Sequence, residues 1–347
     1  MNKFDKYKNK GLSGLANLGN SCYINSCMQI ISHTYELNNI LEDGKYKRVL
    51  NEISDSVITL EWDKLRELLW NANCVVAPYG FIKSVRKIAE IKDRDIFIGS
   101  AQNDLPEFLL FIIDCFHTSI ARKVDMQISG NSQNSTDELA KICYGMMKQM
   151  YNKEYSELLE LFYGIHVSEL SHITTGDVLS LTPEPFSVLN LPIPSNNPNP
   201  TIYDCFDLYC SKEVLMGDEA WKNEKTEAYQ DVNRRILFWS LPNIMIIDLK
   251  RWTNYKNKNQ IYVEAPLTNA DFSKYVKGYN SNSYVYELYG VCNHIGGMSG
   301  GHYTAYIKNA NEKWYEFNDT SVREISENSV ISSYSYCFFY RKKVINK

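Results

Sequence analysis

The stretch Gly14-Leu-Ala-Asn-Leu-Gly-Asn-Ser-Cys22-Tyr-Ile-Asn-Ser26 decides how this chain is interpreted, because it places a cysteine at the start of an amphipathic helix. Asn20 or Ser21 is suited to cap that helix. Cys22 would then lie near unpaired backbone N–H groups and the positive end of the helix dipole, which predicts a lowered thiol pKa. Apolar residues recur on one face of the helix: Ile24, Cys27, Met28 and Ile31.

Asn17 lies five residues before the cysteine, where its side-chain amide could donate to an oxyanion that forms beside Cys22. Gly14 and Gly19 permit the close backbone approach that presents a reactive side chain to a cleft. The simpler interpretation is that Cys22 is a small buried hydrophobe, as most free cysteines are. The Gly- and Asn-rich segment before the helix favours a reactive thiol.

A histidine segment follows far downstream, in Gly300-Gly-His302-Tyr-Thr-Ala-Tyr306. Alternating residues predict strands over 286–293, 302–308, 313–317 and 336–341, and short polar turns between most of them favour an antiparallel sheet. Asn318, at the end of the neighbouring strand, could accept the second ring N–H of His302 and fix its tautomer. A distant cysteine, histidine and amide of this kind are typical of a cysteine-hydrolase triad.

Each of these residues also has a simpler interpretation. A lone histidine is more often a hydrogen-bonded core residue, and His294 competes with His302 for the role of base. The pair Asn318-Asp319 could be an ordinary turn. The two glycines before His302 and the neighbouring strand both favour His302 over His294.

The segment Asp104-Leu-Pro-Glu107 predicts the start of a helix with a capping box, because Pro106 is allowed in the first turn and Glu107 lies three residues after the cap. The run from Phe108 to Phe116 is apolar on nearly every face, so the helix should be buried. A purely structural core helix is an equal alternative to a role in catalysis.

Together these segments resemble the ubiquitin-specific proteases. Gly14–Ser26 resembles the cysteine box of that family, Tyr289–Val322 resembles its histidine box, and Gln102–Phe108 resembles its Gln/Asp/Glu-Phe box. Further matches occur in the family's order between about residues 11 and 341: Leu161-Phe-Tyr-Gly164, Glu184-Pro-Phe186, Leu189-Asn-Leu-Pro-Ile193 and Leu241-Pro-Asn-Ile-Met-Ile-Ile-Asp-Leu-Lys-Arg251. An ordered series of this length is far more specific than any single box.

The resemblance implies an α+β, papain-like fold with thumb, fingers and palm subdomains. A single catalytic domain would span residues 1–347, with the thumb at about 11–160, the fingers at 161–235 and the palm at 236–345. The sequence pattern agrees, because strand patterns dominate from about residue 162. Helical patterns precede them over 22–36, 61–71, 78–91, 105–120 and 136–161.

The resemblance also implies roles for the residues of the site. Cys22 would be the nucleophile, His302 the general base and then acid, Asn318 the third triad member, Asp319 a supporting acid and Asn17 the oxyanion donor. The Gly296–Gly301 loop would gate a narrow cleft. The cleft for the substrate tail would be lined by Gln102, Asp104, Glu107, Gly300, Gly301 and Tyr303.

The implied activity is a deubiquitinating cysteine protease, a ubiquitin C-terminal hydrolase that cleaves isopeptide or thioester bonds at the last glycine of ubiquitin. Its partners would be ubiquitin and ubiquitinated proteins, and we expect a monomer. Two alternatives remain open. The chain could be a ubiquitin-binding pseudoenzyme, or it could be a protease for another ubiquitin-like modifier.

One departure from the family concerns zinc. Many members carry two Cys-x-x-Cys pairs in the fingers, but alignment on the flanking segments puts other residues at those positions. Cys205 and Cys210 are five apart and lack a second pair. We therefore expect no structural zinc and no other cofactor. The four aligned residues are His172, Thr175, Asn223 and Thr226.

The composition is that of an ordinary globular chain, with 347 residues, 44% of them apolar, and a formal net charge of −4. Nine cysteines without framework spacing favour reduced thiols in an intracellular compartment, the cytoplasm or nucleus, or a virion if the source is viral. No apolar signal follows Met1 and no run approaches about 18 apolar residues, so neither secretion nor a membrane partner is expected. The sequence has no stripe of Lys and Arg residues, so a nucleic-acid partner is not expected.

Overall fold

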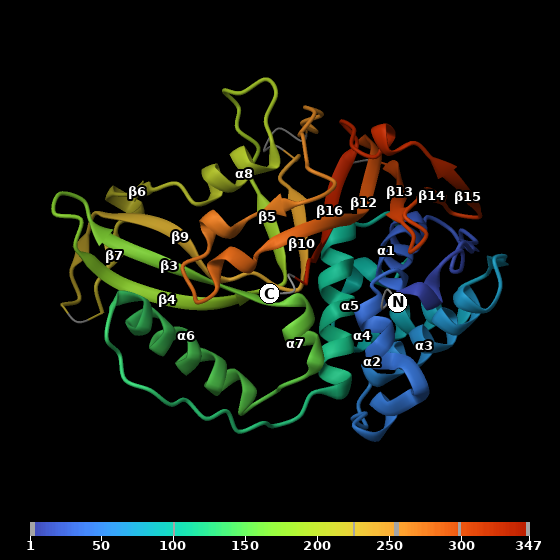
Figure 1. Ribbon diagram of the computed structural model, residues 1–347, viewed down its shortest axis with the longest axis horizontal. Coiled ribbons are helices and arrows are strands. Elements are labelled where there is room, and N and C mark those ends of the chain that lie inside the picture. Colours follow the sequence, from blue (N-terminus) through green and yellow to red (C-terminus); the bar gives the residue numbers. More distant parts are fainter. Residues whose placement is uncertain (1–3, 100, 225, 253–256, 298–299, 345–347) are drawn as a thin grey trace.

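The computed structural model describes residues 4–99, 101–224, 226–252, 257–297 and 300–344 (Figure 1). Helices from the first third of the chain, blue to green in Figure 1, lie against strands from its end, in orange and red. A second sheet, yellow and green, extends away on the other side. The expected α+β class is confirmed. Among the described residues, no helix combines the length and apolarity needed to cross a membrane.

The first group of helices forms one side of the molecule. The helix expected over 22–36 is shorter than predicted, because Thr34 leaves helical geometry and its hydroxyl bonds the Tyr289 hydroxyl at 2.8 Å. The predictions at 78–91 and 105–120 are confirmed to within one residue. The group comprises α1 (Cys22–Ser32), α2 (Tyr35–Leu41), α3 (Ser56–Asn71), α4 (Tyr79–Ile91) and α5 (Leu105–Ile120).

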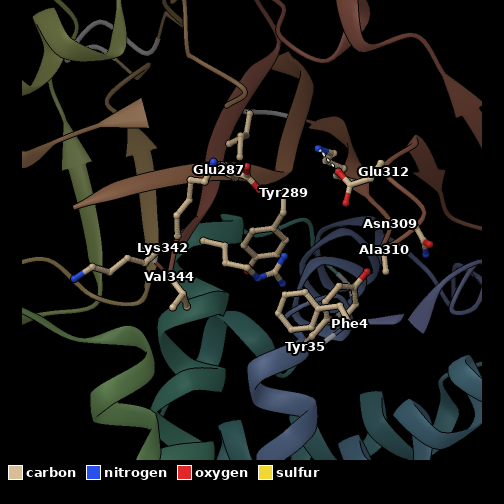
Figure 2. A pocket seen from close by; sticks show the side chains of 13 residues that line it. Phe4, Tyr35, Glu287, Tyr289, Asn309, Ala310, Glu312, Lys342 and Val344 are labelled. Atoms are coloured by element: carbon tan, nitrogen blue, oxygen red, sulfur yellow. Dashed lines mark ion pairs between the residues drawn. The ribbon is translucent and has the colours of Figure 1, made fainter. Parts of the chain in front are cut away.

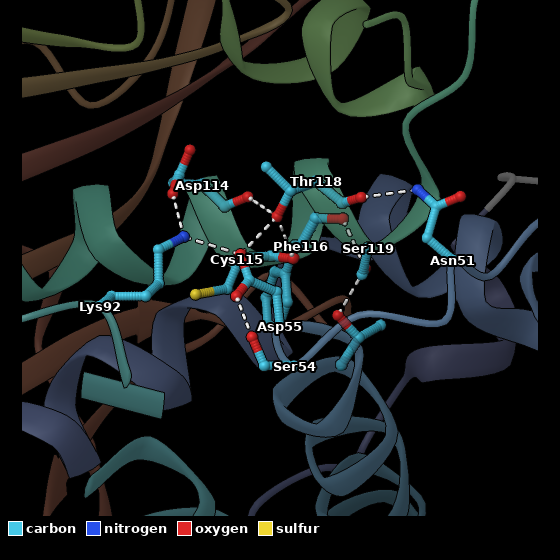
Figure 3. A network of polar contacts seen from close by, with 10 residues as sticks. Asn51, Ser54, Asp55, Lys92, Asp114, Cys115, Phe116, Thr118 and Ser119 are labelled. Atoms are coloured by element: carbon cyan, nitrogen blue, oxygen red, sulfur yellow. Dashed lines mark hydrogen bonds and ion pairs between the residues drawn. The ribbon is translucent and has the colours of Figure 1, made fainter. Parts of the chain in front are cut away.

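Polar contacts tie the end of α5 to α3 and α4 (Figure 3). Lys92, which follows α4, donates to Asp55 before α3 at 2.7 Å and to Asp114 on α5 at 2.8 Å. Thr118 donates to the same Asp55 carboxylate, and the Asn51 side chain donates to the Thr118 carbonyl. These bonds hold the helices in the arrangement that buries α5, whose burial the apolar run predicts.

The helix expected over 136–161 is interrupted. It divides into α6 (Ser135–Tyr151) and α7 (Glu157–Phe162). The break has two local causes. The backbone of Tyr155 pairs with Arg122, and the Ser156 side chain caps the new helix by accepting the Leu158 N–H. In Figure 1, α6 lies along the second sheet while α7 lies next to α5.

The large sheet has the order β15-β14-β13-β12-β16-β10-β5, and β11 also pairs with β12. The four strands predicted near the C-terminus are confirmed as antiparallel neighbours. The bounds are β5 (Val188–Leu191), β10 (Ile244–Leu249), β11 (Ala270–Asp271), β12 (Val285–Gly297), β13 (Gly300–Lys308), β14 (Trp314–Asn318), β15 (Ser321–Ile325) and β16 (Ser335–Lys342).

Both faces of this sheet are covered, which explains why its central strands are almost continuously apolar. On β16, Cys337 and Phe339 belong to the core shared with the helices. The alternate residues Phe338 and Tyr340 belong to a separate core on the opposite face. The helix α1 is buried along its whole length against β13 and α5, so its first residue is held in a fixed position relative to the sheet.

The second sheet has the order β4-β3-β9-β6, with α6 packed on one face. Pro183 and Pro185 are tolerated in β4 because it is an edge strand. Its strands are β3 (Gly164–His172), β4 (Val178–Phe186), β6 (Glu213–Leu215) and β9 (Val232–Ser240); nearby lie α8 (Ile202–Tyr209), β7 (Trp221–Lys222) and β8 (Tyr229–Gln230). Near the N-terminus, β1 (Gly14–Leu15) pairs with β2 (Val75–Val76). Single 3₁₀ turns occupy 5–7, 95–97, 217–219, 273–275, 281–283 and 327–329. Residues 42–48 form a longer 3₁₀ segment that is kinked at Asp43 and Gly44.

Candidate active site

Cys22 is the first residue of α1, and Ser21 is its N-cap as expected. The backbone N–H groups of Tyr303, on β13, and of Tyr23 favour the thiolate form of Cys22 and so act to lower its pKa. Burial nevertheless raises the pKa of Cys22 above its usual value, and the nearby charge of Asp319 adds to this. The lowered pKa predicted from the helix start is therefore wrong for this structure, because desolvation of the thiolate outweighs the stabilising N–H groups.

His302 and Asn318 lie on neighbouring strands, and the expected hydrogen bond between them is present. His302 Nε2 is 2.8 Å from Asn318 Oδ1. Because an amide oxygen can only accept, Nε2 carries the proton and Nδ1 is left as the ring nitrogen that can take a proton from a thiol. Within the described residues no hydrogen bond joins Cys22 to His302. Catalytic contacts are often long in a free enzyme, so this geometry does not exclude the pair.

Asn17 is held in one orientation by contacts at both ends of its side-chain amide. Its Oδ1 accepts from the backbone N–H groups of Gly19 at 3.1 Å and Ser21 at 3.2 Å. Its Nδ2 donates to Asp319 Oδ2 at 2.9 Å. One N–H of Nδ2 therefore bonds the carboxylate, which leaves the second N–H as a donor for an oxyanion.

Asp319 uses its second carboxylate oxygen to hold α1. Asn25 Nδ2 donates to Asp319 Oδ1 at 2.7 Å, so one carboxylate links the segment before Cys22, the helix after it and the turn after Asn318. The turn comes close to Gly14, where a Cβ atom would lie 2.3 Å from the Thr320 carbonyl. Sequence reasoning missed Asn25, although a buried amide one turn after the cysteine on an apolar helix was a visible signal.

A cavity of about 330 Å³ lies between the start of α5 and the β12–β13 hairpin, and Gln102, which lines it, also contacts Cys22. Three of the predicted cleft residues line it: Gln102, Asp104 and Tyr303. Gly301 contacts Gln102 directly. Glu107 is exposed on the first turn of α5 and does not line the cavity, and Gly300 is exposed beside Gly301. The cavity is also lined by residues that sequence reasoning did not assign to it: Asn103, Trp252, His294 and Gly297.

The loop predicted to gate the cleft is described only in part. Residues 298 and 299 lie outside the described residues. The flanking glycines belong to β12 and β13, where Gly296 pairs with Gly301.

The capping box predicted at Asp104 is not formed. Asp104 is the N-cap residue of α5 and Pro106 lies in its first turn, but the carboxylate makes no cap hydrogen bond. It accepts instead from the hydroxyl groups of Tyr336 at 2.9 Å and Tyr303 at 3.4 Å. Burial raises the pKa of this carboxyl. The Asp104 carboxylate thus bonds tyrosine hydroxyls and lines the cavity, and it does not cap the N-terminus of α5.

His294 is a poor competitor for the role of base. Lys258 Nζ donates to its Nδ1 at 2.9 Å. Burial and the Lys258 charge lower the pKa of His294 to about 4. A ring that is already engaged and resists protonation cannot readily take a thiol proton.

Comparison with known proteins shows the family of this chain. A family profile described as "Ubiquitin carboxyl-terminal hydrolase" matches residues 13–340. This chain belongs to that family. Ubiquitin carboxyl-terminal hydrolase Usp2 of Drosophila melanogaster is 33% identical over 96% of this chain and 35% of its own length. Human ubiquitin carboxyl-terminal hydrolase 2 is 33% identical over 95% of this chain and 55% of its own length. The chain thus spans about a third to a half of these relatives.

Solved structures show the fold of this hydrolase-family chain. The Ubp8 subunit of the SAGA DUB module bound to monoubiquitin gives a TM-score of 0.73 at 22% identity, covering 98% of this chain and 71% of that one. The module bound to ubiquitin aldehyde gives 0.73 at 23% identity over the same shares. The papain-like fold expected from the sequence is confirmed.

The four positions that the sequence comparison aligns with zinc-binding cysteines lie in two hairpins. His172 ends β3, and its Nδ1 accepts from the backbone N–H groups of Thr174 and Thr175. Asn223 and Thr226 lie between β7 and β8, joined by a backbone hydrogen bond. Among the described residues, no group of three or more His, Cys, Asp or Glu side chains is arranged to hold a metal ion. The absence of structural zinc remains a prediction.

A second cavity, about 380 Å³, lies where β12 begins and β13 ends, away from Cys22 (Figure 2). Arg341 lies over the rings of Phe4, Tyr35 and Tyr289 there, within 4.9 Å of each ring centre. Its charge is paired with Glu36 at 3.0 Å. The cavity contains none of the predicted site residues, so it does not enter the proposed chemistry.

Proposed function

We propose that this chain is a deubiquitinating cysteine protease that hydrolyses isopeptide or thioester bonds at the C-terminal glycine of ubiquitin. The observation that carries the proposal is the His302–Asn318 hydrogen bond on strands next to Cys22, within a chain of this hydrolase family. The oriented amide of Asn17 adds the donor that acyl transfer needs.

The first step follows from the protonation states. Burial keeps the proton on Cys22 in the free protein, so the thiolate must form when the substrate orders the site. His302 Nδ1 takes the thiol proton while Asn318 holds the opposite ring nitrogen. The sulfur adds to the glycine carbonyl carbon, and Asn17 Nδ2 donates to the oxyanion, a contribution of about 10²–10³-fold.

The second half of the reaction returns the proton. The His302 imidazolium donates it to the leaving lysine amine, and the tetrahedral adduct collapses to a thioester on Cys22. His302 then takes a proton from water, which attacks the thioester and releases the free ubiquitin carboxylate and the thiol. General acid and base catalysis of this kind contributes roughly 10²–10⁴-fold.

The best test uses ubiquitin with a thiol-reactive group at its C-terminus. Wild-type protein should gain the mass of one ubiquitin, and Cys22→Ala should gain none. Cys74→Ala is the matched control, because Cys74 is an exposed thiol outside the site and its loss should leave labelling unchanged. Labelling that persists in Cys22→Ala would refute the assignment of the nucleophile.

The same assay separates the alternatives. A protease for another ubiquitin-like modifier would react with that modifier's probe and ignore ubiquitin. A pseudoenzyme would bind ubiquitin without forming an adduct. The complete set of Cys22, His302 and Asn318 favours the hydrolase.

The remaining expectations form part of this proposal. We expect a single catalytic domain that works as a monomer inside cells, with no cofactor, no structural zinc, and no nucleic-acid or membrane partner. Ubiquitin is supported as a ligand by the solved relatives, whose titles name monoubiquitin and ubiquitin aldehyde as bound molecules. Metal analysis of the purified protein tests the zinc prediction, which one stoichiometric zinc ion would overturn.

A further inference from the structure

On its β14 side, the part of β13 near Cys22 pairs with no other strand among the described residues. The ladder between β13 and β14 begins at the pair Ala305↔Phe317, so residues 300–304 lie beyond the end of that ladder. In an antiparallel strand, alternate residues direct their N–H and C=O groups to the same side. Gly301, Tyr303 and Ala305 therefore share one edge. Ala305 pairs with β14 on this edge, and the Tyr303 backbone favours the thiolate form of Cys22.

The remaining edge position, Gly301, is occupied by a side chain of the protein itself. The Gly301 N–H donates to Gln102 Oε1 at 2.5 Å, and Gln102 Nε2 donates back to the Gly301 carbonyl. A primary amide carries the same donor and acceptor as a peptide group. The Gln102 carboxamide thus makes both hydrogen bonds that an added peptide strand would make to Gly301.

Gln102 also contacts both the cavity and Cys22. Its side chain lines the 330 Å³ cavity, and its Nε2 lies 3.9 Å from Cys22 Sγ. An extended peptide rises about 3.3 Å per residue, so a substrate residue paired with Gly301 in place of the Gln102 amide would lie roughly one residue from a carbonyl placed at Cys22. The position that Gln102 fills is therefore on the path of a peptide tail that reaches the sulfur.

We infer that Gln102 is an internal latch: its carboxamide imitates the backbone N–H and C=O of one substrate residue on the Gly301 edge, holds the cleft closed in the free protein, and must be displaced by the substrate backbone. The ligand class is an extended peptide whose residues near the scissile carbonyl expose their backbone. The inference rests on the proposed function for the identity of that peptide, but the Gln102–Gly301 contact exists without it. Since the open state alone binds substrate, the latch reduces apparent affinity by the fraction of molecules that are open.

The first experiment needs no substrate. Amide hydrogen exchange at Gly301 is measured in the free wild-type protein, in Gln102→Ala and in Gln127→Ala. Gln127 is an exposed glutamine in a loop outside the site, and its side chain contacts Asp125. Gln102→Ala should speed exchange at Gly301, while Gln127→Ala should match wild type. Unchanged exchange in Gln102→Ala would overturn the latch whether or not the protein is a deubiquitinase.

The second experiment measures the rate at which the ubiquitin probe labels Cys22. Loss of the latch should raise the second-order rate about 3- to 10-fold in Gln102→Ala, the effect of one or two displaced neutral hydrogen bonds. Gln102→Asn is a second variant, because the shorter side chain keeps an amide but cannot reach both Gly301 groups. Slower labelling in both variants would show that Gln102 binds the substrate rather than blocks it. Labelling at the wild-type rate would show that the contact does not restrict access to Cys22. Either result would overturn the inhibitory role.

The two measurements distinguish failure of the latch from failure of the proposed function. If wild-type protein does not react with any modifier probe, the proposed function fails, and exchange at Gly301 still decides whether Gln102 closes the edge. If wild-type protein reacts but Gln102→Ala exchanges and labels like wild type, the proposed function stands and the latch is rejected.

Discussion

Asp319 connects parts of the candidate site that come from opposite ends of the chain. Its two carboxylate oxygens bond Asn17 and Asn25, which flank Cys22 in sequence. The residue itself adopts a left-handed backbone conformation, with φ of +48°, which Asp tolerates better than most residues. Its effect on catalysis should therefore pass through the orientation of Asn17.

This coupling can be measured with a double-mutant cycle. Asn17→Ala should lower kcat/KM by about 10²–10³-fold, because it removes an oxyanion donor. Asp319→Ala should cause a smaller loss, and the double variant should be close to Asn17→Ala alone, since neighbours that act as one unit are not additive. Asp125→Ala, in an exposed loop, serves as the control. Hydrolysis of a fluorogenic ubiquitin C-terminal amide gives the rates, and fully additive losses would contradict the coupling.

At the scale of elements, the position of α1 depends on how the helices around it are packed. The ends of α3, α4 and α5 meet at the polar network of Figure 3. Asp55 is central to it, since its carboxylate accepts from both Lys92 and Thr118 while its side chain is 8% exposed. Removing it leaves a half-buried lysine with one carboxylate partner instead of two.

Asp55→Ala should lower the free energy of unfolding by about 1–3 kcal/mol, the range for buried hydrogen bonds to a charged group. Lys45→Ala is the control. Lys45 pairs with Asp43 at 3.5 Å, but both side chains are more than 70% exposed, so its loss should change stability by less than about 0.5 kcal/mol. Urea denaturation of both variants checks the difference. Equal effects would mean that the network contributes little.

The sequence predicts elements well where the signal is local. The apolar run and Pro106 placed α5 correctly, and alternating residues placed β12, β13, β14 and β16. The break at Thr34 was missed because its partner, Tyr289, is distant in sequence. The short strand β15 and helix α8 give too few residues for a clear period.

The residues of the candidate site also divide into those with a local sequence signal and those that depend on distant contacts. Cys22, His302 and Asn318 stand in compact motifs that can be read from the chain. Trp252, His294 and the Gln102–Gly301 contact depend on how distant loops fold together, which no local pattern reports. The raised pKa of Cys22 was missed for a similar reason, since burial is a property of the packed molecule.

At the scale of the whole molecule, stability should depend on a carboxyl group in the core between the strands. Burial raises the pKa of Asp248 to about 8, although Asn190 and Cys337 hydrogen-bond to it. The unfolded chain loses this proton near pH 4, so the folded state binds more protons between about pH 4 and 8. Stability from this group is therefore complete below the unfolded pKa and is lost as pH rises through about 8.

Raising the pH from 6 to 8.5 should lower the free energy of unfolding of wild type by about 2 kcal/mol through this group, at roughly 1.4 kcal/mol per pH unit while the folded state stays protonated. Asp248→Asn should flatten the profile in that window. Urea midpoints at several pH values give both curves. The same slope in wild type and variant would show that another group is responsible.

The link between Asn17 and Asp319 spans 302 positions of sequence. A ribosome making this chain therefore produces Cys22 and its helix long before the strands that supply His302 and Asn318. The nascent chain carries a thiol with neither base nor oriented oxyanion donor until the last strands leave the exit tunnel, because contacts so distant in sequence form late. The proposed chemistry is thereby unavailable during synthesis until the segments around Asn17 and Asp319 meet.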